Sequence, residues 1–324
     1  MRAVVLESYG GPEVLTLRDV PDPVPGPDEV VVRVAATAVN RADLLQRMGL
    51  YPGPPMDHEI PGMELAGLVE SVGQRVDAQL VGSPVMAIVG GGAYAELAVV
   101  PERQLMAVPS TVGLPDAGAI PEVFVTAYDA LVLQGGLTAG GWALVHAGGS
   151  GVGTAAIQLV HAVGARVIVT CSSGKVDRCR DLGADVVVDY DSDDFVDAAL
   201  AATAGVGVDV VLDVVGGEYV ARNLAATKVT GRIVQVGVMG GGRADVPVGD
   251  LLRKRISWIG TVLRGRPAEE KVAVSRRCGH DLVPLFESGV LRPVIDRRFR
   301  LEDVAAAHEY VASNANVGKV LLQV

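Results

Sequence analysis

The chain has 324 residues, of which 49% are hydrophobic, and it carries a formal net charge of −10 at pH 7. At roughly 150 residues per domain this length allows two domains, and the apolar content is enough for a large core. The acidic balance and the lack of a basic tract disfavour binding to nucleic acid or to anionic membranes. We find no signal peptide, no apolar run of about 20 residues that would span a membrane, and no CxxC pair among the three cysteines. We therefore expect a cytoplasmic protein.

Short, strand-like segments fill the first third of the chain. They mix apolar–polar alternation with runs of β-branched residues, and turns rich in Pro and Gly separate them. The segments are RAVVLESYG (2–10), VLTLRDV (14–20), EVVVRVAATAVN (29–40), AGLVESVG (66–73) and SPVMAIV (83–89). This pattern predicts an irregular antiparallel or mixed β-structure.

From about Leu137 onward, short apolar strands alternate with helical segments. The predicted strands are WALVHAG (142–148), RVIVT (166–170), DVVVDY (185–190), VDVVLDVVG (208–216), RIVQVG (232–237) and ISWIGTVL (256–263). Such alternation is typical of βαβ units with a parallel sheet, and six strands make a doubly wound dinucleotide-binding fold.

The last sixty residues follow a looser pattern. Two helices (269–289 and 301–313), a strand between them near PVIDRRF (293–299) and a closing strand (319–324) are predicted. Because the six-stranded sheet is complete without them, we expect the tail to return to the first domain. The predicted domains are 1–118 together with 266–324, and 119–265.

The stretch HAGGSGVGTAAIQ (146–158) joins the first strand of the parallel sheet to a helix. Glycines in such a turn let backbone N–H groups approach a pyrophosphate, and the helix N-terminus adds a partial positive charge. A strict GxGxxG is absent, because Ser150 stands at the second glycine position; we expect its N–H and hydroxyl to serve the phosphate. A helix-capping turn without a ligand is the alternative. The cofactor-binding residues predicted here are Gly149, Ser150, Gly151, Val152 and Gly153.

The end of the second strand of the parallel sheet selects the nucleotide. NAD-dependent enzymes place an acidic residue there, about 20 residues after the glycine turn, to bind the ribose hydroxyls. Here the segment reads IVTCSSGK (168–175), with no Asp or Glu before Asp177. Ser173 is able to hydrogen-bond a 2′-phosphate and Lys175 to neutralise it, so we predict NADPH rather than NADH. A solvated lysine is the alternative interpretation of Lys175.

Five segments resemble the medium-chain dehydrogenase/reductase superfamily and, within it, the zinc-free, NADPH-dependent quinone oxidoreductases related to zeta-crystallin. They are GGPEVL (10–15), AVNRADLLQRMGLYPGPP (38–55), HAGGSGVGTAAIQL (146–159), GVMGGG (237–242) and NVGKVLL (316–322). The resemblance spans nearly the whole chain. It implies an α/β fold in which a doubly wound, six-stranded parallel Rossmann sheet accompanies a mostly β, GroES-like catalytic domain, with hydride transfer in the cleft between the domains.

The same resemblance bears on a catalytic zinc ion, which requires three protein ligands and one open position. In the zinc-dependent branch of the superfamily a Cys takes the place of Asn40, and a Gly-His-Glu motif follows. Here that motif is Gly62-Met63-Glu64, so a methionine replaces the imidazole, and no cysteine precedes Cys171. We therefore expect no metal.

The family pattern implies three catalytic residues, Asn40, Asp43 and Tyr51. Tyr51 is expected to orient the substrate or to pass a proton to its reduced oxygen, whereas Asp43 is equally compatible with a first-turn helix residue. Two of the implied cofactor contacts have alternative interpretations. Thr126 is alternatively a helix threonine that bonds to its own backbone, and Arg264 is alternatively a surface cation. Beyond Ser173 and Lys175, the implied cofactor contacts are Thr126, Tyr190, Gly237, Val238, Met239, Leu263, Arg264 and Asn316.

The function expected from this resemblance is NADPH:quinone oxidoreductase. Reduction of an activated alkene, such as a 2-enal or an enoyl thioester, is the alternative activity, and a non-catalytic structural role is a third interpretation. We expect a small-molecule substrate, no nucleic acid or membrane partner, and a homodimer paired through the apolar strand 256–263.

Overall fold

The computed structural model describes all residues, 1–324, and divides the chain into two compact units. The first unit comprises Met1–Val125 and Arg264–Val324, and the second comprises Thr126–Leu263. The first boundary lies seven residues after the one predicted from the sequence at 118/119. The second lies two residues before the one predicted at 265/266. Helix α3 (Pro121–Tyr128) crosses the first boundary, which explains why a composition change does not mark it.

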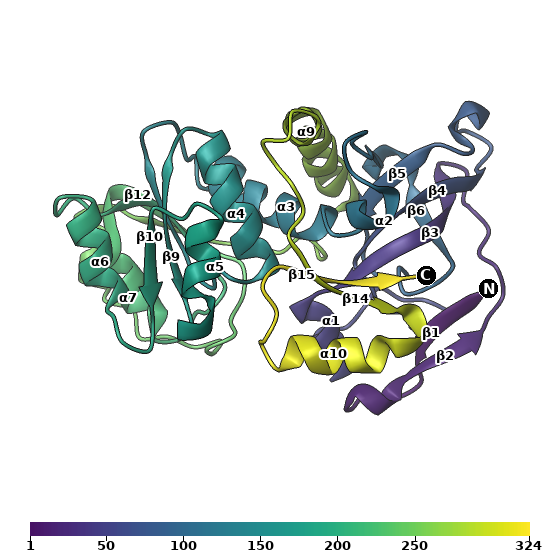
Figure 1. Cartoon of the computed structure of the whole chain (residues 1–324), viewed down its shortest axis with the longest axis horizontal. Coiled ribbons are helices and arrows are strands. Elements are labelled where there is room, and N and C mark those ends of the chain that lie inside the picture. Colours follow the sequence, from purple (N-terminus) through teal and green to yellow (C-terminus); the bar gives the residue numbers. More distant parts are fainter. The chain divides into compact units, whose positions relative to one another are not determined.

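The first unit is built on a seven-stranded sheet in the order β14-β15-β3-β4-β5-β7, with β6 also paired to β3. A separate two-stranded antiparallel sheet joins β1 to β2. All pairings in the larger sheet are antiparallel except the parallel pair β14–β15. The strands are β1 (Arg2–Leu6), β2 (Leu15–Asp19), β3 (Glu29–Val39), β4 (Glu64–Val72), β5 (Pro84–Ile88), β6 (Leu97–Pro101), β7 (Met106–Ala107), β14 (Ile295–Arg300) and β15 (Lys319–Gln323). This confirms the predicted mostly β domain and places the last strand of the chain in it (Figure 1).

Strand β3 forms the centre of this unit because nearly all of its residues are apolar, which suits a strand that is covered on both faces. Its β-branched residues pack with those of β4 and β6 in one core cluster, which includes Val32, Leu65 and Val100. The helices of the unit are α1 (Arg41–Arg47), α2 (Leu114–Ala117), α9 (Ala268–Glu287) and α10 (Val304–Ala312). Helix α10 contributes to a second core cluster against β1 and β15.

The second unit contains a six-stranded sheet in the order β10-β9-β8-β11-β12-β13, and every neighbouring pair is parallel. The strands are β8 (Trp142–Val145), β9 (Arg166–Cys171), β10 (Val186–Asp189), β11 (Val208–Asp213), β12 (Thr227–Gln235) and β13 (Ser257–Gly260). In chain order this sheet reads 3-2-1-4-5-6, which is the doubly wound order. The sequence prediction of six parallel strands is confirmed.

Helices cover both faces of the parallel sheet, with α4 and α5 on one side and α6 and α7 on the other (Figure 1). They are α4 (Gly151–Ala162), α5 (Val176–Asp181), α6 (Phe195–Ala202), α7 (Tyr219–Ala226) and α8 (Val248–Lys254). A π-helical stretch, Asp129–Gln134, follows α3 directly. The core between the sheet and α6 and α7 joins Ile168 and Val211 to Phe195 and Leu224.

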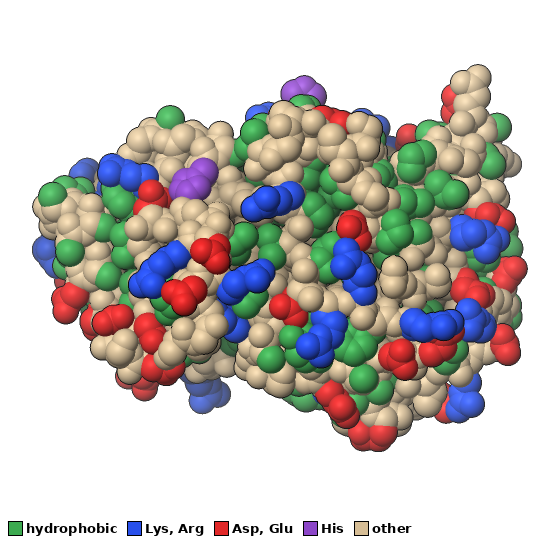
Figure 2. Space-filling view, in the orientation of Figure 1, with side chains coloured by type: hydrophobic (Ala, Val, Ile, Leu, Met, Phe, Trp, Pro, Cys, Tyr) green, Lys and Arg blue, Asp and Glu red, His purple; other side chains and the backbone are tan.

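None of these helices combines the length and the apolar character that a bilayer crossing requires. Acidic and basic side chains are interspersed over the face drawn in Figure 2, without a continuous basic stripe.

Candidate functional site

The glycine-rich turn connects the carboxyl end of β8 to the N-terminus of α4. Ala147 adopts a left-handed backbone with φ of 59°, and the N–H of Gly148 donates to the carbonyl of Thr170 at 2.8 Å. A methyl group on Gly153 would lie 2.4 Å from the carbonyl oxygen of Ala147, so no larger residue fits there. The glycine is therefore needed for the turn to close onto the first turn of the helix.

Ser150 is the N-cap of α4, and its Oγ accepts the N–H of Gly153 at 3.0 Å. Its own N–H donates to the carbonyl of Ala147 at 2.8 Å. The expectation that this N–H serves a phosphate is therefore not met in the structure, because the tight turn uses it internally. The hydroxyl proton is the group that Ser150 can still offer, while Gly151 and Val152 form the first turn of the helix.

The end of β9 brings Lys175 back to this turn. Ser173, Gly174 and Lys175 form a short 3-10 helix, in which Ser173 is exposed and Lys175 is half-buried. The Lys175 stem lies over Gly149, since a methyl group on that glycine would be 2.6 Å from Lys175 Cδ. The structure thus brings the Lys175 stem and Gly149 together.

The other predicted cofactor residues of this unit also follow the carboxyl ends of strands, apart from Thr126, which is buried in α3. Tyr190 comes directly after β10 and is 47% exposed. Gly237 follows β12, where its carbonyl accepts the Gln235 amide at 2.6 Å, and Leu263 follows β13. The side chains of Val238 and Met239 are exposed. The parallel register places these strand ends on one edge of the sheet, where ligands of such folds bind.

His146, directly after β8, is part of a buried polar chain at the same edge. Its Nε2 lies 2.7 Å from Asn223 Oδ1, and the Asn223 amide donates to Asp213 Oδ2 at 2.9 Å. Asp213 Oδ1 in turn accepts the backbone N–H groups of Val215 and Gly216. Burial lowers the pKa of His146, so a neutral ring joins the end of β8 to the loop after β11.

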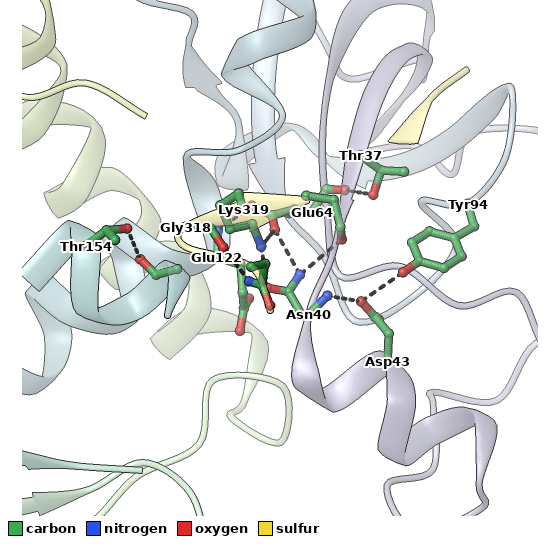
Figure 3. A network of polar contacts seen from close by, with 12 residues as sticks. Thr37, Asn40, Asp43, Glu64, Tyr94, Glu122, Thr154, Gly318 and Lys319 are labelled. Atoms are coloured by element: carbon green, nitrogen blue, oxygen red, sulfur yellow. Dashed lines mark hydrogen bonds and ion pairs between the residues drawn. The ribbon is translucent and has the colours of Figure 1, made fainter. Parts of the chain in front are cut away.

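In the first unit, the strand register brings three polar residues together. Asn40 follows β3, Glu64 begins β4 and Lys319 begins β15, and both of these strands run antiparallel to β3. Lys319 Nζ donates to Glu64 Oε1 at 2.7 Å and to Asn40 Oδ1 at 2.6 Å, and Asn40 Nδ2 donates to Glu64 Oε1 at 2.8 Å (Figure 3). The ion pair is buried, with Glu64 at 0% and Lys319 at 3% side-chain exposure. We call these three residues the Glu64 cluster.

Asp43 lies next to the Glu64 cluster in the first turn of α1. Its Oδ2 accepts the N–H of Asn40 at 2.8 Å and the hydroxyl of Tyr94 at 3.1 Å, while Oδ1 has no partner. Burial raises the pKa of Asp43 to about 6, against the hydrogen bond from Asn40 and the charge of Lys319. Since Asp43 caps the helix and is fully buried, the structure favours the helix interpretation that the sequence left open.

The Tyr94 hydroxyl continues this chain to His308 Nε2 at 3.2 Å. Burial lowers the pKa of His308 to about 3, so the imidazole is neutral. Its Nδ1 has no hydrogen-bond partner. Tyr94 and His308 are thus structural neighbours of Asp43 that the sequence did not single out.

Tyr51 lies on the loop after α1 and is held by Arg264. The guanidinium donates to the carbonyls of Tyr51 at 3.2 Å and Gly90 at 2.6 Å, and to Gln46 Oε1 at 2.5 Å. It also lies 4.9 Å from the centre of the Tyr51 ring. Arg264 was predicted as a cofactor contact, and in the structure it fastens the loop that carries Tyr51. The Tyr51 hydroxyl itself makes no hydrogen bond within the chain, and burial raises its pKa.

Glu122 is the functional candidate that the sequence analysis missed. It is the second residue of α3, and its backbone N–H donates to Glu64 Oε2 at 2.9 Å. Burial and the neighbouring Glu64 raise the pKa of the Glu122 carboxyl to about 8. An acidic residue inside the apolar stretch AIPEVFV was the available signal, although an ordinary first-turn helix glutamate gives the same pattern.

Asn316, the last predicted cofactor residue, precedes β15, and its amide donates to the carbonyl of Gly318 at 2.8 Å. This bond orders the turn that delivers Lys319 to the Glu64 cluster. No three His, Cys, Asp or Glu side chains converge in a group that could hold a metal ion.

Comparisons with known proteins assign both units to one family. Residues 26–110 match the alcohol dehydrogenase GroES-like domain, and residues 151–276 match the zinc-binding dehydrogenase domain. The quinone oxidoreductase of Pseudomonas aeruginosa is 33% identical over 99% of this chain and 99% of its own. The chain belongs to the quinone oxidoreductase family of medium-chain dehydrogenases/reductases. It is therefore an oxidoreductase.

Other members of the wider superfamily are similar over the whole chain. The rat synaptic vesicle membrane protein VAT-1 homolog is 33% identical over 99% of this chain and 84% of that protein. Escherichia coli quinone oxidoreductase, solved in complex with NADPH, has a TM-score of 0.89 at 28% identity and covers 100% of both chains. The JamJ enoyl reductase has a TM-score of 0.89 at 27% identity, covering 99% of this chain and 98% of its own.

The burial of the Glu64 cluster predicts a large effect of Lys319→Met on stability. The substitution leaves a buried carboxylate without its cation, which typically costs about 3–5 kcal/mol of unfolding free energy. The double variant Lys319→Met/Glu64→Gln should recover much of this loss, because the charge is removed as well. Denaturant unfolding measures both. As a control, Arg103→Met removes the exposed pair Arg103–Glu269 and should cost less than about 1 kcal/mol; equal losses for Lys319→Met and Arg103→Met would contradict the prediction.

Proposed function

We propose that the chain reduces quinones with NADPH and without a metal ion. The observation that carries the proposal is the position of the Lys319 ammonium, 2.6 Å from Asn40 Oδ1. Asn40 stands where the zinc-dependent branch has a cysteine ligand. At that position the Lys319 ammonium, rather than a zinc ion, binds the side-chain oxygen of Asn40. The similarity to the Pseudomonas aeruginosa quinone oxidoreductase over the whole chain supports quinones as the substrate class.

The residues of the second unit fit a dinucleotide that carries a 2′-phosphate. The turn has no side chains at Gly149 and Gly153, and the N-terminus of α4 presents its partial positive charge there. Lys175 lies over Gly149 and no carboxylate ends β9, which favours NADPH over NADH. When bound, the nicotinamide supplies the hydride. We assign the remaining contacts to the strand-end residues and helix residue predicted above: Thr126, Ser173, Tyr190, Gly237, Val238, Met239 and Leu263.

The three predicted catalytic residues take different roles in this proposal. Tyr51 contacts the substrate, because its hydroxyl is free of hydrogen bonds within the chain and its ring is held by Arg264. Asn40 is a positioning residue, since both atoms of its amide are bonded in the Glu64 cluster. Asp43 supports Asn40 from the first turn of α1 and is too buried to meet a substrate.

Lys175→Ala is predicted to change the nucleotide preference. Loss of a charge-assisted contact to the 2′-phosphate should weaken NADPH binding about 10-fold or more, while NADH binding stays unchanged. Isothermal titration of both nucleotides measures this. Arg178→Ala, which removes an exposed cation from the neighbouring helix α5, is the matched control and should leave both affinities unaltered. Equal losses of NADPH and NADH in Lys175→Ala would show that the 2′-phosphate is held elsewhere.

Reduction of an activated alkene is the second candidate, which the similarity to the JamJ enoyl reductase favours. The two are separated by following NADPH oxidation with 1,2- and 1,4-quinones and, in parallel, with 2-enals and enoyl thioesters. We expect turnover of quinones. Activity with the alkenes alone would overturn the proposal that quinones are the substrates. It would leave standing the proposal that the chain is an NADPH-dependent reductase.

We further propose a homodimer paired through β13, which is an edge strand of the parallel sheet. Trp258 in this strand is 40% exposed, and Val262 just beyond it is 54% exposed. Such an apolar edge is a template for pairing with a second copy. Trp258→Glu should therefore convert a dimer into a monomer in multi-angle light scattering. A wild-type chain that is monomeric at micromolar concentration would refute this assembly.

A further inference from the structure

Glu122 carries a carboxyl group that the fold holds in place but does not use. Its backbone is fixed at the start of α3 by the hydrogen bond to Glu64 Oε2, and the residue is half-buried. The carboxyl oxygens make no hydrogen bond or ion pair within the chain. Figure 3 shows Glu122 beside Lys319 and Asn40. The half-buried Glu122 carboxyl group is therefore left without a partner in the chain, next to a cluster whose side chains are bonded to one another.

The charges around Glu122 favour its neutral form. Glu64 on β4 and Asp43 on α1 add negative potential, whereas Lys319 on β15 and Arg264 oppose it. Lys319 is already bonded to Glu64 and Asn40, and Arg264 to the loop of Tyr51, so neither cation pairs with Glu122. Burial is the largest cause that raises the pKa of Glu122 to about 8, followed by the charge of Glu64. At neutral pH the group is therefore a carboxylic acid.

The charge of Glu122 also acts on the Tyr51 hydroxyl. After burial, the charge of Glu122 is the interaction that raises the pKa of Tyr51, while Arg264 lowers it. The first unit thus presents two proton-bearing groups that have no partner in the chain, a phenol and a carboxylic acid. Only the carboxylic acid changes its protonation state close to neutral pH.

We propose that Glu122 is the acid that delivers the proton to the reduced substrate, and that Tyr51 orients the substrate oxygen; this inference rests on the proposed function. The quinone receives two electrons and one hydrogen as the hydride of NADPH, and the second hydrogen leaves the Glu122 carboxyl group as a proton. The products are the hydroquinone, NADP⁺ and the Glu122 carboxylate, and a proton from water restores the acid. With an activated alkene, the hydride enters the β-carbon and the same proton completes the product at the α-carbon.

The test compares Glu122→Gln with the wild type. The amide has the size and neutrality of the acid but cannot donate its proton, so NADPH affinity and KM for the quinone should stay unchanged while kcat falls about 100-fold. Since the acid form is required, wild-type kcat should be constant below and decline above a pH of about 8, and the variant should lack this inflection. Glu102→Gln, a half-buried glutamate of the first unit, is the matched control and should behave as the wild type.

Infrared spectroscopy of the ligand-free protein gives a readout that does not depend on turnover. A carboxylic acid C=O band should disappear as the pH passes about 8, and Glu122→Gln should lack that titrating band. Wild-type kcat and an unaltered pH profile in Glu122→Gln would overturn the inference and leave the proposed function standing. A wild-type protein that binds NADPH and reduces neither quinones nor alkenes would overturn both.

Discussion

The buried ion pair between Glu64 and Lys319 is the interaction on which the arrangement of the first unit depends. It joins the starts of β4 and β15 at the end of β3, and Glu64 also accepts the first free N–H of α3. Taking both charges out of water is costly, and hydrogen bonds from Asn40 and Glu122 to Glu64 offset that cost. Burial raises the pKa of the neighbouring carboxyl groups, that of Asp43 to about 6 and that of Glu122 to about 8, and the charge of Lys319 opposes both shifts.

The second unit also contains a buried chain of hydrogen-bonded polar side chains. His146, Asn223 and Asp213 are fully bonded to one another and to the loop after β11, and they order the carboxyl edge of the parallel sheet. In both units most of the polar groups that shape the framework are bonded, whereas Asp43 Oδ1 and His308 Nδ1 have no hydrogen-bond partner. The Tyr51 hydroxyl and the Glu122 carboxyl are also unbonded within the chain, and they are the two groups to which we assign chemistry.

The parallel sheet was predictable from the sequence because its signal is local. Each strand is a short apolar run between turn residues, so all six strands were found, and the glycine turn was found at the end of the first. The hydrogen bonding of Ser150 was not predictable, since the tightness of the turn decides where its N–H points. The residue types thus predicted a dinucleotide at the carboxyl edge of the parallel sheet. Which backbone N–H groups of the glycine turn are not already hydrogen-bonded depends on the geometry of the turn.

The polar site of the first unit was predictable only in part. The family pattern pointed to Asn40, Asp43 and Tyr51, but Asn40 and Lys319 are 279 residues apart, and only the antiparallel pairing of β3 and β15 brings them together. Glu64 entered the sequence analysis as part of a zinc motif, and Glu122 was passed over as an ordinary helix residue. The family pattern assigned Arg264 to the cofactor, which stays a prediction, and it gave no sign that the side chain bonds to Gln46, Tyr51 and Gly90.

Metal analysis of the purified chain, together with NADPH-dependent quinone reduction before and after dialysis against a chelator, tests the central claim most directly. We predict no stoichiometric zinc and the same turnover after dialysis. The reason is that the Lys319 ammonium already binds Asn40, which stands at the position of a zinc ligand in the zinc-dependent branch. One zinc ion per chain, with activity that is lost on chelation and restored by zinc, would contradict it.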